Sequence, residues 1–297
     1  VAMTSDILRA ALDQTGDAYS AESVLRLLPE TFTPQELEEV LASSELDSPV
    51  RRTADGLLER IRSHAASSYR LVFPRGSAIA DRVIVPHSAA ESSGLEDARF
   101  VRFEDRDGRA SYLGTYTAFD GSHVAPHLLQ TDDFVTFDVM PMLGPAAQNK
   151  GMALFPRRIS GDMWALSRWD RENISVARST DGIRWGSPQV VLTPRQPWEV
   201  IQLGVCSSPI ETAAGWLVLT HGVGPMRVYS MGAVLLDTED PTRVLGVLPA
   251  PLLTPEADER DGYVPNVVYS CGAIVNGNTV VIPYGCSDAN IRFAFVD

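Results

Sequence analysis

The spacing of apolar residues divides the chain into two parts. Before about residue 66, apolar residues recur three and four positions apart, as between Ile7 and Leu12, which predicts amphipathic helices. From residue 69 onward the period changes to two, which is typical of half-buried β-strands. We therefore expect a helical insertion or appendage at residues 1–68 and an all-β domain at residues 69–297.

The strand-rich part repeats a unit of four predicted strands. Turn glycines recur between the first two strands of each unit, at a spacing of roughly fifty to sixty residues: Gly108, Gly161, Gly215 and Gly277. Such a repeat is typical of a β-propeller, and a β-sandwich with irregular turns is the alternative. Four units are visible. Because an open sheet edge exposes unpaired backbone groups, we expect either a fifth blade or strands missing from this sequence.

Composition excludes several classes of function. The 297 residues carry a formal net charge of −13 and no extended basic cluster, which argues against a nucleic-acid partner. No apolar run is long enough to span a membrane and no signal peptide is visible, so we expect a cytoplasmic location. Cys206, Cys271 and Cys286 lack the spacing of a disulfide framework or a zinc motif. His123 and His127 fall on a predicted strand, about 13 Å apart, so we predict no metal site.

Two carboxylates and an arginine stand together at the start of one predicted strand. The segment Gly94–Phe100 contains Glu96, Asp97 and Arg99. Similar strand starts recur at residues 152–157, 207–212 and 269–273. Because the inner strands of a propeller begin around one centre, we expect these polar groups to line a shared funnel. From the residues alone, a salt-bridge network that only holds the blades together is the alternative.

Seven stretches, in order, resemble glycoside hydrolase family 130, the β-mannoside phosphorylases and β-mannosidases. They are residues 94–99, 116–121, 149–156, 208–212, 215–222, 235–241 and 262–268. The resemblance covers roughly two thirds of the chain and leaves the helical part outside. It implies a five-bladed β-propeller and an N-terminally trimmed member of a hydrolase-like subgroup.

The resemblance also implies roles for single residues. Asp97 would be the general acid, passing its proton through a hydroxyl of the bound mannose. Lys150 and Arg168 fall at or near basic positions that gather phosphate in the family's phosphorylases. Glu211 stands where many of those enzymes carry lysine, and a carboxylate repels phosphate but can activate water.

These roles favour an inverting β-mannosidase that acts on β-1,2-linked manno-oligosaccharides. Asp97 would be the acid and Glu211 the base, with their carboxyl groups roughly 6.5–9.5 Å apart. A structural ion pair of Glu211 with Arg227 or Arg168 is the alternative, and Asp170, Glu172 and Glu259 are weaker candidates for the base.

Two other functions stay open. One is a β-mannoside phosphorylase that uses inorganic phosphate as cosubstrate, and the other is a non-catalytic carbohydrate-binding propeller. The hydrolase would need no cofactor. The expected partner is an oligosaccharide, and a homo-oligomer is neither required nor excluded. The expected sugar or phosphate contacts are Glu96, Arg99, Tyr116, Asp120, Lys150, Arg168, Asn173, His221, Arg227, Tyr263, Asn266 and Asp288.

Overall fold

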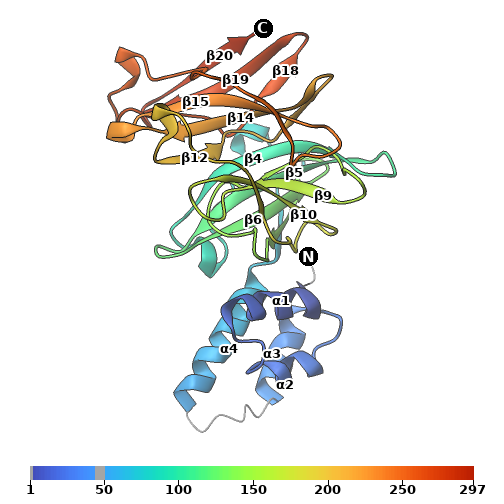
Figure 1. Cartoon of the computed structure of the whole chain (residues 1–297). Helices are drawn as coiled ribbons and strands as arrows, with labels where there is room; N and C mark the ends of the chain where they lie inside the picture. The colour runs from blue at the N-terminus through green and yellow to red at the C-terminus, as the bar shows by residue number, and fades with distance from the viewer. Residues whose placement is uncertain (1–2, 44–50) are drawn as a thin grey trace.

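A computed structural model describes residues 3–43 and 51–297 as a helical segment beside a strand-rich domain (Figure 1). The helices are α1 (Ser5–Thr15), α2 (Glu22–Leu27), α3 (Pro34–Ser43) and α4 (Arg51–Ala66), and a short strand pair joins β1 (Met3–Thr4) to β2 (Thr31–Phe32). The helices end at Ala66 and β3 begins at Tyr69, so the change in hydrophobic period marks a real change of structure.

The helical segment has a core of its own. Leu8, Leu12, Val24 and Ile61 are fully buried in one apolar cluster drawn from α1, α2 and α4. Helix α1 begins where the Thr4 hydroxyl accepts a hydrogen bond from the Ile7 amide, and it ends at Gly16 in the left-handed conformation. Local caps and apolar spacing therefore explain this segment without reference to the rest of the chain.

The strand-rich domain contains four antiparallel sheets. The first has the order β3-β7-β6-β5-β4, the second β11-β10-β9-β8, the third β12-β14-β15-β16 with β13 beside β14, and the fourth β17-β19-β18 with β20 beside β19. In the first two sheets the strands are β3 (Tyr69–Val72), β4 (Gly94–Glu104), β5 (Ala110–Phe119), β6 (Val124–Thr131), β7 (Thr136–Pro141), β8 (Ala153–Leu154), β9 (Met163–Ser167), β10 (Ile174–Ser179) and β11 (Gln189–Leu192). In the third and fourth they are β12 (Gln202–Val205), β13 (Ile210–Thr212), β14 (Gly215–Val223), β15 (Tyr229–Leu236), β16 (Val244–Val247), β17 (Val268–Tyr269), β18 (Ile274–Asn276), β19 (Thr279–Cys286) and β20 (Asn290–Val296).

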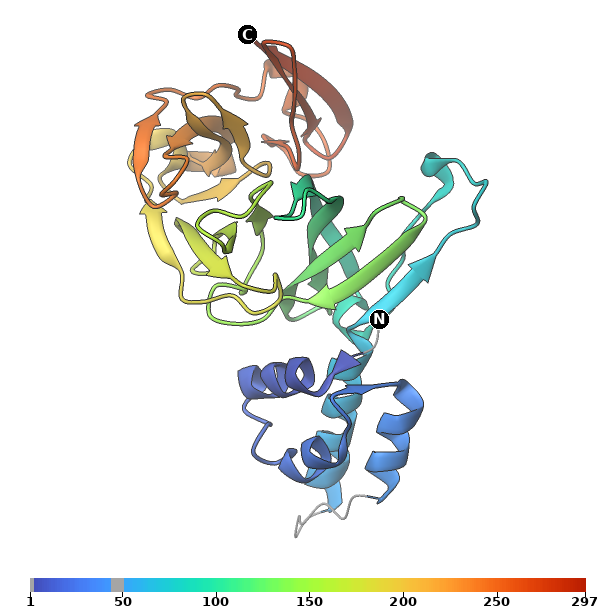
Figure 2. The same cartoon turned by 90° about the vertical axis from the view of Figure 1, so that its right-hand side faces the viewer.

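The sheets follow one another around a common centre, as blades do (Figure 2). The predicted all-β propeller architecture is thus confirmed. The expected number of blades is corrected, because the described strand-rich domain forms four sheets rather than five. Each predicted four-strand unit forms one sheet. The strand Tyr69–Val72, which precedes the first unit, pairs with β7 in the first sheet instead of starting another.

Apolar side chains fill the space between neighbouring sheets. Phe103 and Trp185 are buried between the first and second sheets, and Phe155 meets Trp216 edge to face at 5.2 Å between the second and third. Ile282 belongs to the cluster between the third and fourth sheets. Burying each such side chain contributes roughly 1.5–3 kcal/mol, so these clusters hold the inner strands in place around the centre.

A short helical turn with a buried glutamate precedes each of the strands β4, β12 and β17. Glu91, Glu199 and Glu259 are 0%, 3% and 2% exposed, and each closes a capping box. Glu259 also accepts from the Tyr284 hydroxyl and pairs with Arg292, so it is committed to structure and is no candidate for a base. The 3₁₀ turns of the domain are η1 (Ile79–Asp81), η2 (Ala89–Glu91), η3 (Pro197–Glu199), η4 (Pro225–Arg227) and η5 (Ala257–Glu259).

Within the described ranges, no helix has both the length and the apolar character that crossing a membrane requires.

Candidate active site

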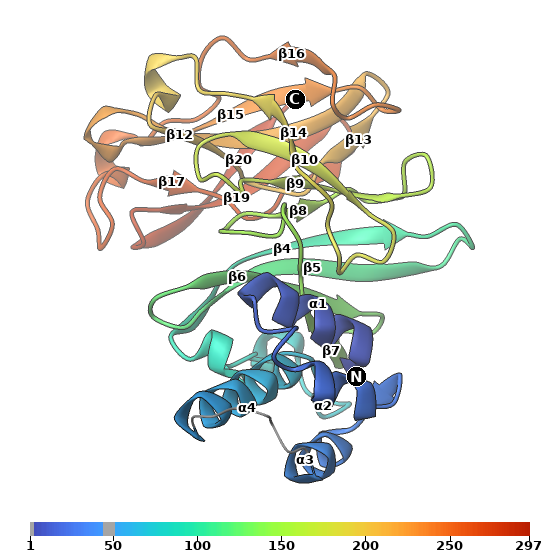
Figure 3. The ribbon, with the colours of Figure 1, turned by 60° about the horizontal axis from the view of Figure 1, so that its bottom comes forward.

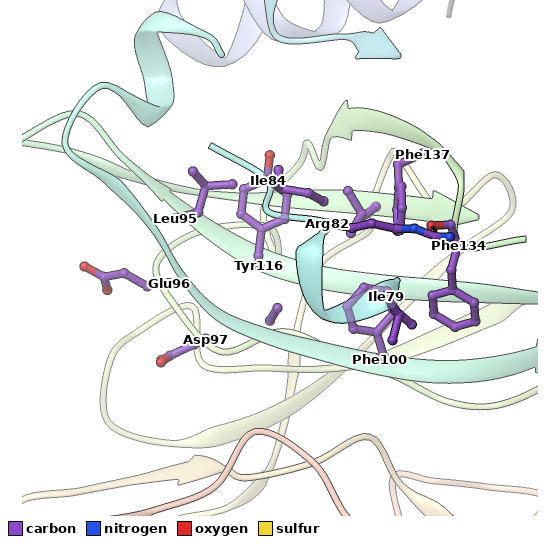
Figure 4. Close-up of a pocket in the computed structure, with 12 residues that line it drawn as sticks. Ile79, Arg82, Ile84, Leu95, Glu96, Asp97, Phe100, Tyr116, Phe134 and Phe137 are labelled. Atoms are coloured by element: carbon purple, nitrogen blue, oxygen red, sulfur yellow. Dashed lines mark hydrogen bonds between the residues drawn. The ribbon is translucent and has the colours of Figure 1, made fainter. Parts of the chain in front are cut away.

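Asp97 lies on a bulge in strand β4. The pairing of β4 with β5 shifts between Glu96 and Arg99, and Asp97 there has a φ of 58°. A residue other than glycine in this left-handed region costs of order 1–3 kcal/mol, and bulges commonly re-aim a side chain next to an active site. The Glu96 and Asp97 side chains point away from the apolar side chains of Phe100 and Phe134 (Figure 4). Both residues line the same largely apolar pocket as Phe100 and Phe134, with their carboxylates turned away from those two rings.

A buried arginine fixes the Asp97 backbone and side chain. Arg99 is 1% exposed, and it donates to the Asp97 carbonyl at 2.7 Å, to the Val205 carbonyl on β12 and to the Tyr269 hydroxyl on β17. The Tyr269 hydroxyl in turn donates to Asp97 Oδ2 at 3.0 Å. Strands from three sheets thus meet at Asp97.

This network changes the role expected for Arg99 and adds Tyr269. Arg99 was expected to contact sugar, but its burial makes it a positioning residue for Asp97. Burial raises the pKa of Tyr269 well above its usual 10, so the phenol keeps its proton and acts as a donor. Tyr269 is the first residue of the repeated segment 269–273, which corresponds to the segment that contains Asp97. This correspondence was the signal that could have identified Tyr269.

A basic pocket of about 680 Å³ is linked to Glu96 through one of its lining residues, Lys150. Lys150, Arg168 and Arg171 line it, and the Lys150 ammonium is paired with the Glu96 carboxylate. Arg168 Nε is buried and has no hydrogen-bond partner among the described residues. Arg171, which sequence reasoning missed, is exposed and donates to Asn149 Oδ1 at 2.8 Å. Three cations around one hollow, one of them carrying an unused buried donor, fit an anionic ligand.

His221 supports Arg168 from the interior. It is 3% exposed, and its Nε2 lies 3.4 Å from Arg168 Nη1. Burial, followed by the charge of Arg168, lowers the pKa of His221 well below 6.5, so the neutral ring can accept from the guanidinium. A Cβ on Gly204 would lie 2.3 Å from the His221 ring, which explains the glycine at this position. His221 therefore positions Arg168, and its burial does not fit the direct sugar contact that was expected.

Glu211 does not lie opposite Asp97. It pairs with Arg157, whose Nε is 3.0 Å from Glu211 Oε2 and whose guanidinium lies over the Trp216 ring. Arg157 forms a β-bridge with Glu104, at the far end of β4 from Asp97. Seven residues of strand correspond to about 20 Å, well beyond the roughly 6.5–9.5 Å expected for an inverting pair. The expected acid–base pair is thus corrected, because Glu211 occupies the opposite end of its blade.

Three other expected contacts are engaged in local structure. Tyr116 is buried, and its hydroxyl donates to the Glu91 carboxylate. Asp120 accepts from two backbone amides of the turn that follows it. Asn173 donates to Asp170 Oδ2 at 2.7 Å within the β9–β10 turn. These side chains shape the strands and turns beside the pocket, and nothing in their contacts assigns them to a sugar.

The last four expected contacts come from the loops of the third and fourth sheets. Their side chains make no hydrogen bond or ion pair within residues 3–43 and 51–297, so their sugar-binding role stays a prediction. They are Arg227, Tyr263, Asn266 and Asp288. In the same described ranges, no three His, Cys, Asp or Glu side chains are grouped so as to hold a metal ion.

Comparison with known proteins relates the strand-rich domain to one protein family. Residues 75–297 match the model of glycoside hydrolase family 130, described as beta-1,4-mannooligosaccharide phosphorylase. The 1,2-beta-oligomannan phosphorylase of Thermoanaerobacter sp. (strain X514) is 33% identical over 70% of this chain and 69% of its own length. The beta-1,2-mannobiose phosphorylase of Listeria innocua is 34% identical over 70% of this chain.

A solved structure of a relative has a similar fold. The beta-1,2-mannobiose phosphorylase of Listeria innocua in complex with beta-1,2-mannobiose superposes with a TM-score of 0.66 at 32% identity, covering 72% of this chain and 61% of that one. The chain spans 69% and 59% of the lengths of the two curated relatives. The helices before residue 75 lie outside the family match.

Proposed function

The chain belongs to glycoside hydrolase family 130, and we propose that it cleaves β-linked mannosides by phosphorolysis. The observation that carries the proposal is a basic pocket whose Lys150 pairs with Glu96, the chain neighbour of Asp97, whereas Glu211 pairs with Arg157 elsewhere. Phosphate is an anion that Lys150 and Arg168 can bind, whereas activation of water needs a base opposite the acid. The phosphorylase alternative of the sequence reading is therefore better supported than hydrolysis.

The proposed reaction uses few groups. Hydrogen phosphate, held by Lys150 and Arg168, attacks the anomeric carbon of the terminal mannose, and the glycosidic carbon–oxygen bond breaks. Asp97 supplies the proton for the leaving oxygen, relayed through a mannose hydroxyl. The attacking phosphate gives up its own proton, which restores Asp97. The products are mannose 1-phosphate and a saccharide shortened by one unit.

The substrate is proposed from the relatives and from the size of the pocket. Two relatives act on β-1,2-linked mannosides by name, and the pocket of about 680 Å³ falls in the range that binds small organic ligands. We therefore propose β-1,2-linked manno-oligosaccharides as substrates, with residues 69–297 as the catalytic domain and inorganic phosphate as cosubstrate. A cytoplasmic location stays a prediction.

One incubation tests the reaction type. The protein is supplied with β-1,2-mannobiose, with and without inorganic phosphate, and the products are separated by anion-exchange chromatography. We expect mannose 1-phosphate only when phosphate is present. Release of free mannose at the same rate without phosphate would restore the hydrolase, and saccharide binding without turnover in either condition would favour the non-catalytic propeller.

A further inference from the structure

Helix α1 is fixed on the first two blades near the basic pocket. Its Ala11 is buried against Leu143 and Ile183, and the Gly144 amide donates to Gln14 Oε1 at 2.9 Å. Figure 3 shows α1 beneath β6 and beside β7. Leu143 and Gly144 belong to the connection between β7 and β8, which also carries Lys150. The last turn of α1 is therefore held on the same connection that carries a cation of the site.

Gln14 forms part of the pocket wall. It is exposed and lines the same hollow of about 680 Å³ as Lys150, Arg168 and Arg171. Its carbonyl oxygen is used by Gly144, but its amide Nε2 makes no hydrogen bond within the described residues. The pocket is far larger than a phosphate ion requires, so it has room for a sugar unit beside the anion. An amide donor at its edge suits a sugar hydroxyl, which accepts as well as donates.

We propose that Gln14 binds the oligosaccharide substrate, so that the helical segment outside the family match takes part in substrate binding. The inference rests on the proposed function for the nature of the ligand. The amide N–H of Gln14 donates to a hydroxyl of the bound saccharide while its carbonyl stays on Gly144. Phosphate is held by the cations and not by Gln14. Loss of the side chain therefore weakens saccharide binding and leaves phosphate binding unchanged.

A purely structural role for Gln14 predicts a different pattern. If Gln14 only anchors the β7–β8 connection, its loss shifts Lys150, which raises the KM for phosphate and leaves the saccharide Kd unchanged. A matched control is Gln35 on α3, whose side chain donates only to Glu39 on the same helix. Gln35→Ala removes the same kind of exposed side chain from the same segment, away from the pocket.

The test is calorimetric titration of β-1,2-mannotriose in phosphate-free buffer, where no phosphorolysis occurs. One hydrogen bond corresponds to a rise in Kd of about 3- to 10-fold, which we expect for Gln14→Ala but not for Gln35→Ala. The KM for phosphate of Gln14→Ala stays at the wild-type value, and its melting temperature falls only by the small amount that loss of the Gly144 hydrogen bond implies. An unchanged Kd, a Kd change matched by Gln35→Ala, or no binding by the wild type would overturn the inference.

The two proposals fail separately. If Gln14→Ala weakens saccharide binding but the wild type forms no mannose 1-phosphate from mannobiose and phosphate, the reaction is misassigned and the Gln14 contact stands. If mannose 1-phosphate forms and Gln14→Ala leaves the saccharide Kd unchanged, the Gln14 contact is misassigned and phosphorolysis stands. A rise in the phosphate KM without a change in saccharide Kd assigns Gln14 to anchoring and also overturns the contact.

Discussion

Two substitutions, Glu211→Gln and Asp97→Asn, distinguish hydrolysis from phosphorolysis most directly. The Glu211 and Arg157 side chains are 42% and 34% exposed, and a solvent-exposed ion pair contributes about 0.2–1 kcal/mol. Glu211→Gln is therefore expected to lower the free energy of unfolding by no more than about 1 kcal/mol. Because Glu211 pairs with Arg157, which bridges Glu104 about 20 Å along β4 from Asp97, we expect no effect on the chemical step.

Asp97→Asn removes the proposed proton donor at the site itself. Loss of a general acid lowers the rate by about 10²–10⁴-fold. The side chain stays similar in size and can still accept from the Tyr269 hydroxyl, so the fold is expected to survive. The two substitutions thus predict opposite outcomes for chemically similar changes of carboxylate to amide.

The assay is the initial rate of mannose 1-phosphate formation, with thermal unfolding measured on the same samples. Arg157→Met is the control, because it breaks the Glu211 ion pair from the other side. We expect it to match Glu211→Gln in both rate and stability. A folded Glu211→Gln variant that loses more than a hundredfold in rate while Arg157→Met keeps its activity would refute the assignment of Glu211 to a structural pair.

Three further predictions concern the pocket and the interior. Lys150→Met is expected to raise the KM for phosphate at least about tenfold, because it removes a charge-assisted bond; an unchanged phosphate KM would place the anion elsewhere. Tyr269→Phe removes the hydroxyl that donates to Asp97 Oδ2, so kcat should fall about tenfold in steady-state assays, and an unaltered kcat would leave Tyr269 with a packing role only. Burial lowers the pKa of both His127 and His221 below 6.5, so below pH 6.5 the unfolded chain binds protons that the folded chain does not. Stability should then fall with decreasing pH by up to about 1.4 kcal/mol per unit for each histidine, and urea unfolding that is equally stable at pH 7 and pH 5.5 would contradict this.

Local sequence patterns predicted much of the fold. The change from helical to strand period at residues 66–69, and the repeated strand units with their turn glycines, were visible because periodicity depends on neighbouring residues alone. The Glu96-Asp97 segment was recognisable for the same reason, since its polar groups stand together at a strand start. The number of sheets was different from expectation, because the early strand at residues 69–72 pairs with residues 136–139 of β7, far along the chain.

Tertiary structure decided what each polar residue does. The sequence alone determined which groups are present: a carboxylate pair, cations at Lys150 and Arg168, and a glutamate at 211. It could not show that Glu211 faces the opposite end of its blade, or that Tyr269 donates to Asp97 from 172 residues away. Such contacts depend on how four sheets pack around one centre, and packing joins residues without any local trace in the chain. The placement of Gln14 in the pocket wall depends on the same long-range contacts.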